Sequence, residues 1–344
     1  YLNAKDKLNN RLLVFAFVIS FVLSKAVRGI GLSDFHPESF LICLSLFTFY
    51  FLIKKRDLLF FITILLILAC KETAVLIIIG FGIYALVSQR RMRLGIVLII
   101  LGIVSWAIET RLIIPFFNLQ GKFPYYVRMP FGDTYKQNLM FILKRPLDFS
   151  RFIFLPGKID YFLRLIAPLG FLPILAPSIY ILVVLPAIII LLASKGLGGY
   201  YDLSSHYSSH VLPFIYIAAI YGTNNLLNFL KKNSRFNKIS LRKVCLILGS
   251  YTIVMSLLFY SKTDAYKLRR FASGIKKNKA FEKLSYLELI PSDASVSASS
   301  NLVPHMAHRK YIFDFNPESP RAVMAEYVVV DLGFVGYLSE SSKQ

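Results

Sequence analysis

The sequence predicts a mainly α-helical protein, a polytopic bundle of transmembrane helices followed by a small C-terminal α/β domain outside the membrane. Hydrophobic residues make up 56% of the 344 residues and charged residues only 17%, and the mean hydropathy is +0.58. The apolar residues lie in long continuous runs without the alternation that is typical of strands. Because only helices and closed barrels satisfy every backbone polar group inside a bilayer, we interpret the runs as helices.

The apolar runs define about nine segments within residues 1–260. A full span needs ~20 residues, so several of the segments are short for a complete crossing. Between the sixth and the seventh segment, 176–178 (Ala-Pro-Ser) fits a tight turn. We place the segments at residues 12–28, 39–53, 58–70, 73–88, 94–117, 161–176, 178–194, 211–230 and 242–260.

The net charge of +21 comes from 40 basic and 19 acidic residues. On a soluble chain this excess would suggest a nucleic-acid partner. In a membrane protein, however, Lys and Arg gather in cytoplasmic loops, and the breaks at 54–56, 90–93 and 231–243 are strongly basic. We therefore place these breaks in the cytoplasm, expect no nucleic-acid partner, and take the lipid bilayer as the partner of the helices.

The pattern changes over residues 261–344, where the apolar runs become short. We expect a small α/β domain there, and counting spans places it on the extracytoplasmic face. Its expected elements are an amphipathic helix over 276–289, strands over 294–298 and 311–315, a helical turn over 301–308 and a buried strand over 327–332.

Histidines and acids gather in the breaks that this topology places outside the cell. No break assigned to the cytoplasm contains a histidine; the five histidines are His36, His206, His210, His305 and His308. Histidine titrates near neutral pH and binds metals, so this distribution suggests a site, although loops are also where polar residues normally lie. The clearest group is Asp34, His36 and Glu38, between two apolar segments.

We take Asp34, Glu38 and His36 as the candidate catalytic residues. A carboxylate in a loop at the membrane face can act as a general base or hold a metal ion. The alternative is structural, because Asp34 could cap the following helix and Pro37 fits the first turn of that helix.

A second group of candidates would bind substrate. Lys71 and Glu72 interrupt an apolar stretch, and charges at membrane depth usually face the interior or a wet cavity; a plain loop is the alternative. His206 and His210 are spaced to share one helix face, as a two-histidine metal site requires, or they could bind sugar hydroxyls or phosphate. The candidate substrate-binding residues are Lys25, Arg28, Lys71, Glu72, His206, Tyr207 and His210, and a possible divalent metal ion would bind among His36, His206 and His210.

Basic residues also lie at the external ends of helices, against the usual charge bias. They are Lys25, Arg28, Lys71, Arg111 and Arg164. An anionic ligand such as a lipid phosphate would explain them, and so would contact with ordinary headgroups. The sequence has no P-loop, dinucleotide-binding glycine motif, nucleophile elbow or kinase motif, which argues against ATP-driven transport.

Several motifs together resemble the domain-of-unknown-function 2079 family of predicted membrane proteins. The 290–309 stretch, which runs from Ile-Pro-Ser-Asp to Pro-His-Met-Ala-His-Arg, is the most specific of them. The others are Asp-Phe-His-Pro-Glu at 34–38, Lys-Glu at 71–72, His-Tyr-Ser at 206–208 followed by Leu-Pro-Phe at 212–214, and Tyr-Val-Val-Val-Asp-Leu at 327–332.

The resemblance implies a glycosyltransferase of the GT-C type, a multi-span enzyme that uses a polyprenyl-phosphate sugar as donor. In that fold a catalytic acid usually lies in the first external loop. The corresponding N-terminal helices and loop are not found in this sequence, so we expect that the natural protein extends further upstream. On this hypothesis the donor phosphate lies near Lys25, Arg28 or Lys71. The alternatives are a lipid or solute transporter or flippase, and a non-enzymatic membrane assembly protein whose tail docks a partner.

Overall fold

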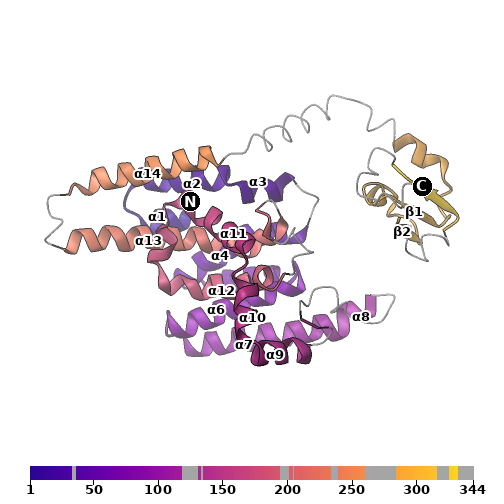
Figure 1. Ribbon diagram of the computed structural model, residues 1–344, viewed down its shortest axis with the longest axis horizontal. Helices are drawn as coiled ribbons and strands as arrows, with labels where there is room; N and C mark the ends of the chain where they lie inside the picture. The colour runs from indigo at the N-terminus through magenta and orange to yellow at the C-terminus, as the bar shows by residue number, and fades with distance from the viewer. Residues whose placement is uncertain are drawn as a thin grey trace. The chain divides into compact units, whose positions relative to one another are not determined.

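The computed structural model of the chain divides into two compact units, Tyr1–Ala265 and Tyr266–Gln344 (Figure 1). The structure describes residues 1–32, 36–117, 131–132, 135–193, 201–203, 205–233, 239–259, 284–315 and 325–331.

The described residues of the first unit form helices and the connections between them, and no strand. Its α-helices are α1 (Leu2–Lys7), α2 (Arg11–Leu23), α3 (Lys25–Leu32), α4 (Leu41–Ile53), α5 (Asp57–Leu68), α6 (Val75–Val87), α7 (Met92–Ile108), α8 (Ile114–Phe117), α9 (Tyr135–Lys144), α10 (Pro146–Ile153), α11 (Pro156–Ile166), α12 (Tyr180–Leu191), α13 (Leu212–Lys232) and α14 (Leu241–Leu258). Short 3₁₀ turns precede four of them: η1 (Pro37–Phe40), η2 (Glu72–Ala74), η7 (Pro177–Ile179) and η9 (His206–His210). A π-helical turn, η3 (Glu109–Ile113), joins α7 to α8.

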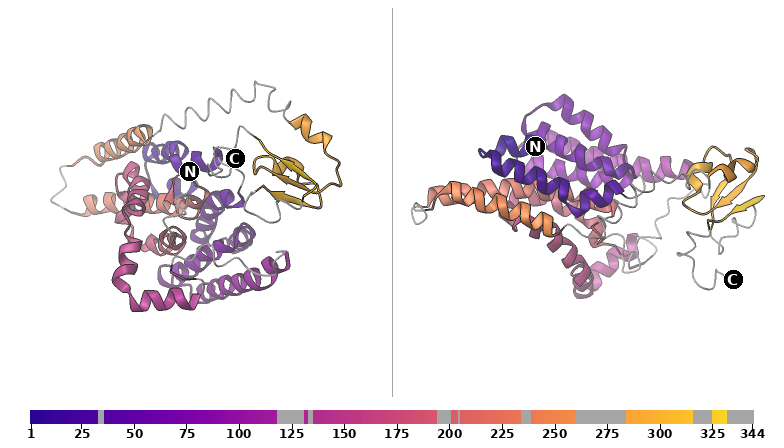
Figure 2. Two further views of the ribbon diagram at one scale, coloured as in Figure 1. Left: turned by 45° about the vertical axis from the view of Figure 1, so that its right-hand side comes forward. Right: turned by 90° about the horizontal axis from the view of Figure 1, so that it is seen from above.

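Helix α13 provides the core of this unit. Every residue over 212–220 is buried, and the helix packs against α1, α2, α4, α12 and α14. Helices α2 and α14 lie side by side, as do α6 and α7 (Figure 2). A helix that is apolar all round and buried on all sides belongs to the interior of a bundle, so α13 is the element around which the other helices are arranged.

Apolar side chains cover the outside of the bundle as well. On α7, the exposed fractions of Val97, Ile100 and Ile103 are 50%, 55% and 54%. Soluble proteins rarely expose a continuous apolar surface of this kind. Within the described residues, two helices are long and apolar enough to cross a bilayer, Met92–Phe117 and Leu241–Leu258, or three if Arg11–Leu23 and Lys25–Gly31, which are bent by 46°, count as one broken span.

The sequence-based expectation of about nine apolar segments is therefore only partly supported. The further apolar helices are too short for a full crossing by length alone; they are Pro37–Ile53, Asp57–Leu68, Glu72–Val87 and Pro177–Leu191. One segment differs in kind: the expected helix over 161–176 ends at Ile166 and continues as 3₁₀ turns η5 (Ala167–Leu169), η6 (Leu172–Leu175) and η7 (Pro177–Ile179). Prolines at 168, 173 and 177 remove backbone donors, and Gly170 has a positive φ of 63°, so the α-helix cannot continue.

Glycines let two pairs of elements approach closely. A Cβ atom on Gly82 of α6 would lie 2.9 Å from the Gly95 carbonyl oxygen of α7, and one on Gly95 would lie 2.7 Å from the Gly82 oxygen. A Cβ atom on Gly222 of α13 would overlap the Leu172 carbonyl oxygen of η6. Small residues at such contacts are typical of helix packing in membranes, where close backbone approach provides much of the attraction.

The second unit contains a small parallel sheet. Strand β1 (Val296–Ala298) lies between β2 (Ile312–Asp314) and β3 (Tyr327–Val329), in the order β2-β1-β3. Strand β1 is fully buried and packs with Met306 of the 3₁₀ turn η12 (Val303–Met306). The three expected strands and the helical turn are thus confirmed.

Two expectations for this unit come out differently. The third strand is not buried, because Tyr327 and Val328 are 42% and 51% exposed in β3, which pairs only with β1 among the described strands. Of the expected helix over 276–289, residues 276–283 lie outside the described residues, and the part that follows ends in a 3₁₀ turn, η11 (Tyr286–Leu289).

Candidate functional site

A buried carboxylate lies where α4 begins. Glu38 is in the 3₁₀ turn η1, whose first residue, Pro37, fixes the backbone at the start of the turn. The Glu38 side chain is only 2% exposed, and the Lys71 ammonium group donates a hydrogen bond to Oε1 and forms an ion pair with it. Lys71 comes from the break between α5 and η2 and is 17% exposed.

Two histidines complete the surroundings of this carboxylate. His36 Nδ1 lies 3.9 Å from Glu38 Oε2, and His206 Nε2 lies 3.8 Å from Oε1. The two imidazole rings stack on each other, with centroids 3.8 Å apart and an interplanar angle of 24°. The Tyr207 ring faces the Lys71 ammonium group at 5.2 Å. We call His36, Glu38, Lys71 and His206 the Glu38 cluster.

The charge on Glu38 depends on the residues around it. Burial alone raises the pKa of this carboxyl group, but the hydrogen bond from Lys71, a backbone hydrogen bond and electrostatic attraction to Lys71 and His206 together outweigh burial and hold the pKa below its usual value. The carboxylate is therefore ionised at neutral pH. The cluster thus combines one fixed negative charge with a lysine and two titratable rings.

His210 lies behind the cluster and has a different environment. It is completely buried, its Nε2 is 3.1 Å from Thr73 Oγ1, and its Nδ1 is 3.5 Å from Ser209 Oγ. Burial lowers the pKa of His210 to about 4, with Glu38 opposing the shift in part. His210 is therefore neutral at physiological pH, and it ties η9 to η2.

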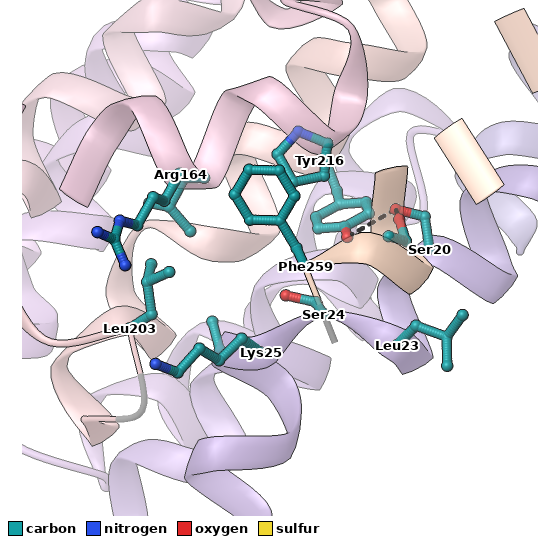
Figure 3. Close-up of a pocket in the computed structure, with 12 residues that line it drawn as sticks. Ser20, Leu23, Ser24, Lys25, Arg164, Leu203, Tyr216 and Phe259 are labelled. Carbon is teal, nitrogen blue, oxygen red and sulfur yellow. Dashed lines mark hydrogen bonds between the residues drawn. The ribbon is translucent and has the colours of Figure 1, made fainter. Parts of the chain in front are cut away.

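A second feature of the unit is a narrow cavity beside α3, with a volume of about 20 Å³ (Figure 3). Lys25, Arg164 and Leu203 line one part of it, and the Tyr216 hydroxyl bonds Ser20 Oγ at 3.1 Å in another. This volume holds about one water molecule. The cavity is therefore too small for a phosphate group in this conformation.

The structure brings together six of the predicted site residues: His36, Glu38, Lys71, His206, Tyr207 and His210. Four others lie apart or are not described. Lys25 lines the narrow cavity, Arg28 Nε donates to the Leu23 carbonyl at 3.1 Å, and Glu72 begins η2 beside Lys71. Asp34 lies outside the described residues.

Sequence reasoning missed the residues that hold the cluster in place. Thr73 and Ser209 contact His210, and Tyr161 of α11 donates to Ser208 Oγ at 3.0 Å, which anchors η9. Both Tyr161 and Ser208 are buried. Two signals in the sequence point to some of them: Thr73, Ser208 and Ser209 are sequence neighbours of candidate residues, and Ser208 also lies in the His-Tyr-Ser motif at 206–208.

Lys158 is a further buried cation that the sequence did not indicate. Its ammonium group donates to the carbonyl oxygens of Leu191, at 2.6 Å, and Phe152, at 3.2 Å. Burial lowers the pKa of Lys158 to about 8. Because it bonds the carboxyl end of α12, where helix carbonyls lack partners, its role is to fasten α11 to α12.

Comparison with known proteins gives one match. The family described as "Predicted membrane protein (DUF2079)" matches residues 1–343. The chain belongs to this family. The DUF2079 match covers the Glu38 cluster and the parallel sheet alike, and the family description names a membrane protein without an activity. No curated protein and no solved structure matches the chain.

The Glu38 cluster can carry out a limited set of chemical tasks. The carboxylate can accept a proton or bind a cation, and Lys71 can neutralise an anion. A neutral imidazole can accept a proton or bind a metal ion, and a protonated one can neutralise an anion. Ionisable groups inside a membrane protein are expensive to bury and usually mark a functional site. We therefore take this cluster as the candidate functional site of this DUF2079 protein.

Proposed function

We propose that the chain is a multi-pass membrane glycosyltransferase that transfers a sugar from a polyprenyl-phosphate donor at the extracytoplasmic face. The observation that supports this proposal most strongly is the Glu38 cluster itself. Its charged and titratable groups come from three separated segments and meet around one buried carboxylate. A buried ion pair contributes little net stability compared with apolar packing, so this arrangement favours a functional role.

The direction of three helices supports the extracytoplasmic location. Helices α4, α6 and α13 each begin beside the cluster, after η1, η2 and η9. Each ends at one of the basic breaks, at 54–56, 90–93 and 231–243. Since basic ends face the cytoplasm, the ends that carry the cluster face the other side.

The chemistry follows from the groups present. The acceptor hydroxyl loses its proton as its oxygen attacks the anomeric carbon of the sugar, and the bond from that carbon to the phosphate oxygen breaks. Polyprenyl phosphate leaves with the electron pair. In our proposal the Glu38 cluster activates the acceptor hydroxyl, whose proton passes to the carboxylate of Glu38 or to water, while Lys71 neutralises the charge that develops on the phosphate. The apolar exterior of the bundle accommodates the lipid tail of the donor.

The proposal is tested with the full-length protein in its own cells. Glu38→Gln and His36→Asn should each remove or strongly reduce a sugar on the cell-surface glycans, measured by mass spectrometry, and Asp34→Asn tests the acid next to them. His305→Asn, in the second unit, is the matched control and should leave the glycans unchanged. Unaltered glycans in all of the cluster variants, at normal protein levels, would overturn the proposal.

Flux measurements address the transporter alternative. If proteoliposomes containing the wild-type chain moved a lipid-linked sugar across the bilayer and formed no transfer product, the transporter interpretation would replace ours. A transporter would use the same intramembrane charges for transit instead of bond cleavage.

A further inference from the structure

The Glu38 cluster contains three potential metal ligands that no direct hydrogen bond joins. His36 Nδ1 and His206 Nε2 lie 3.9 and 3.8 Å from the Glu38 carboxylate oxygens, which is too far for hydrogen bonds. One ligand atom from each of the three residues lies within 4.8 Å of the other two. Ligand bonds to zinc are about 2.0–2.2 Å long, so shifts of under about 1 Å would bring all three atoms onto one ion.

The donor set is as informative as the spacing. Two imidazoles and one carboxylate are the protein ligands of many catalytic zinc sites, which leave a fourth position open, and the same set binds other first-row transition metals. Hard ions such as magnesium and calcium prefer oxygen ligands throughout. The set therefore selects a transition metal.

The surroundings favour an ion at this point. The two rings stack with centroids 3.8 Å apart, which places two nitrogen ligands side by side. Glu38 is 2% exposed, whereas the side chains of His36 and His206 are 39% and 18% exposed, so an ion could enter from the histidine side. Lys71 donates a hydrogen bond to Oε1 of Glu38, and the other carboxylate oxygen, Oε2, lies on the side of His36. A second-shell hydrogen bond of this kind orients a metal-binding carboxylate.

We infer that His36, Glu38 and His206 form a binding site for one divalent transition-metal ion, with zinc as the best match to the ligand set. The inference rests on the proposed function only for what the ion does there. In that function the open coordination position holds the acceptor hydroxyl, and the bound ion makes loss of the hydroxyl proton easier. His210, which bonds Thr73 instead, is not a ligand.

The test uses metal alone, without any sugar donor. The purified full chain in detergent is stripped with a chelator and titrated with Co²⁺, whose visible absorption reports coordination by nitrogen and oxygen ligands. We expect one equivalent to bind, Zn²⁺ to displace it, and His36→Ala and His206→Ala each to weaken binding at least about tenfold. His305→Ala and His308→Ala serve as matched controls and should bind like the wild type.

Two results would overturn the inference: no saturable Co²⁺ binding by the wild-type chain, or equal binding by the wild type, His36→Ala and His206→Ala. Circular dichroism and gel filtration establish that each variant is folded, and Glu38→Gln, which keeps the side-chain shape, provides a third ligand test. Metal binding without sugar transfer would refute the proposed function and support the metal site. Sugar transfer by a chain that binds no metal would support the proposed function and refute the metal site.

Discussion

Arg309 of the second unit and Lys71 of the first unit have opposite surroundings. In the second unit, Arg309 is 7% exposed and donates through its Nη atoms to the backbone carbonyls of Ile290, Pro291 and Ala294. In the first unit, Lys71 pairs with the ionised carboxylate of Glu38. The imidazole nitrogens of His36 and His206 lie near this carboxylate, but too far from it for a hydrogen bond. The Nη atoms of Arg309 are bonded to backbone carbonyls of the fold, although its Nε is buried without a hydrogen-bond partner among the described residues, whereas the Glu38 cluster brings potential metal ligands together around a carboxylate. The difference shows which buried charge is available for chemistry.

The largest expected effect comes from removing the cation of the Glu38 cluster. Lys71→Met leaves a buried carboxylate without its partner, and we expect a loss of about 3–5 kcal/mol in the free energy of unfolding. The single tryptophan, Trp106 in α7, reports unfolding of the first unit by fluorescence. The control is Asp57→Asn, which breaks the exposed Arg91–Asp57 pair and should cost less than about 1 kcal/mol. Equal losses in the free energy of unfolding of the two variants would show that the Glu38–Lys71 pair contributes no more than an exposed surface pair.

Removing the cation of the second unit should have a separate effect. Arg309→Met leaves buried carbonyls without donors, and a loss of about 2–4 kcal/mol follows from hydrogen bonds to a charged group. Limited proteolysis at 284–331 should become faster, while the Trp106 transition should not move. A shift in both measurements would contradict the division into two units.

The pH dependence should locate the titrating group in the first unit. His210 has a pKa of about 4 in the folded chain and about 6.5 when unfolded, so the unfolded chain binds more protons between these values. Stability is therefore fully present above pH 6.5 and is lost as the pH falls. We expect a loss of about 2–3 kcal/mol between pH 7 and 4.5 from this residue. In His210→Asn, the free energy of unfolding measured through Trp106 should depend less on pH. An unchanged pH dependence would contradict the burial of His210.

Two glycines test the packing that supports the cluster. Gly222→Ala places a methyl group on the Leu172 carbonyl, where backbone must move, and should cost about 1–3 kcal/mol. Gly31→Ala, in α3, meets nothing within 4 Å and should be neutral or stabilise by up to about 1 kcal/mol. Thermal unfolding followed through Trp106 measures both variants, and a harmless Gly222→Ala would show that α13 and η6 are not in close contact.

Local patterns made much of the fold predictable. Apolar runs identified most of the longer helices but not α1, α9 and α10, and the short runs at 294–298 and 311–315 identified strands, because these patterns depend on residues close in sequence. The break after Ile166 was not predicted, since the run at 161–176 is apolar apart from Arg164 and only the spacing of its prolines marks the 3₁₀ turns.

The candidate site was predictable as a set of residues but not as an arrangement. The breaks that the sequence predicts to be external hold Glu38, Lys71, His36, His206 and His210, and the expected topology predicts that they lie on one side of the bundle. Which of them meet depends on helix packing: His206 stacks on His36, whereas His210, in the same 3₁₀ turn, bonds Thr73. No local pattern distinguishes these two histidines. Asp34 lies outside the described residues, and its role stays a prediction.

Transfer of sugar by the purified chain tests the central claim most directly. Wild-type protein in proteoliposomes is given a polyprenyl-phosphate sugar labelled in the sugar, together with a glycan extract of the cell envelope, and the labelled glycan and released polyprenyl phosphate are measured. We predict transfer by the wild type and by His305→Ala, and transfer at least about 100-fold slower with Glu38→Gln. Equal rates for wild type and Glu38→Gln, or no release by the wild type, would contradict the assignment of this chemistry to the Glu38 cluster.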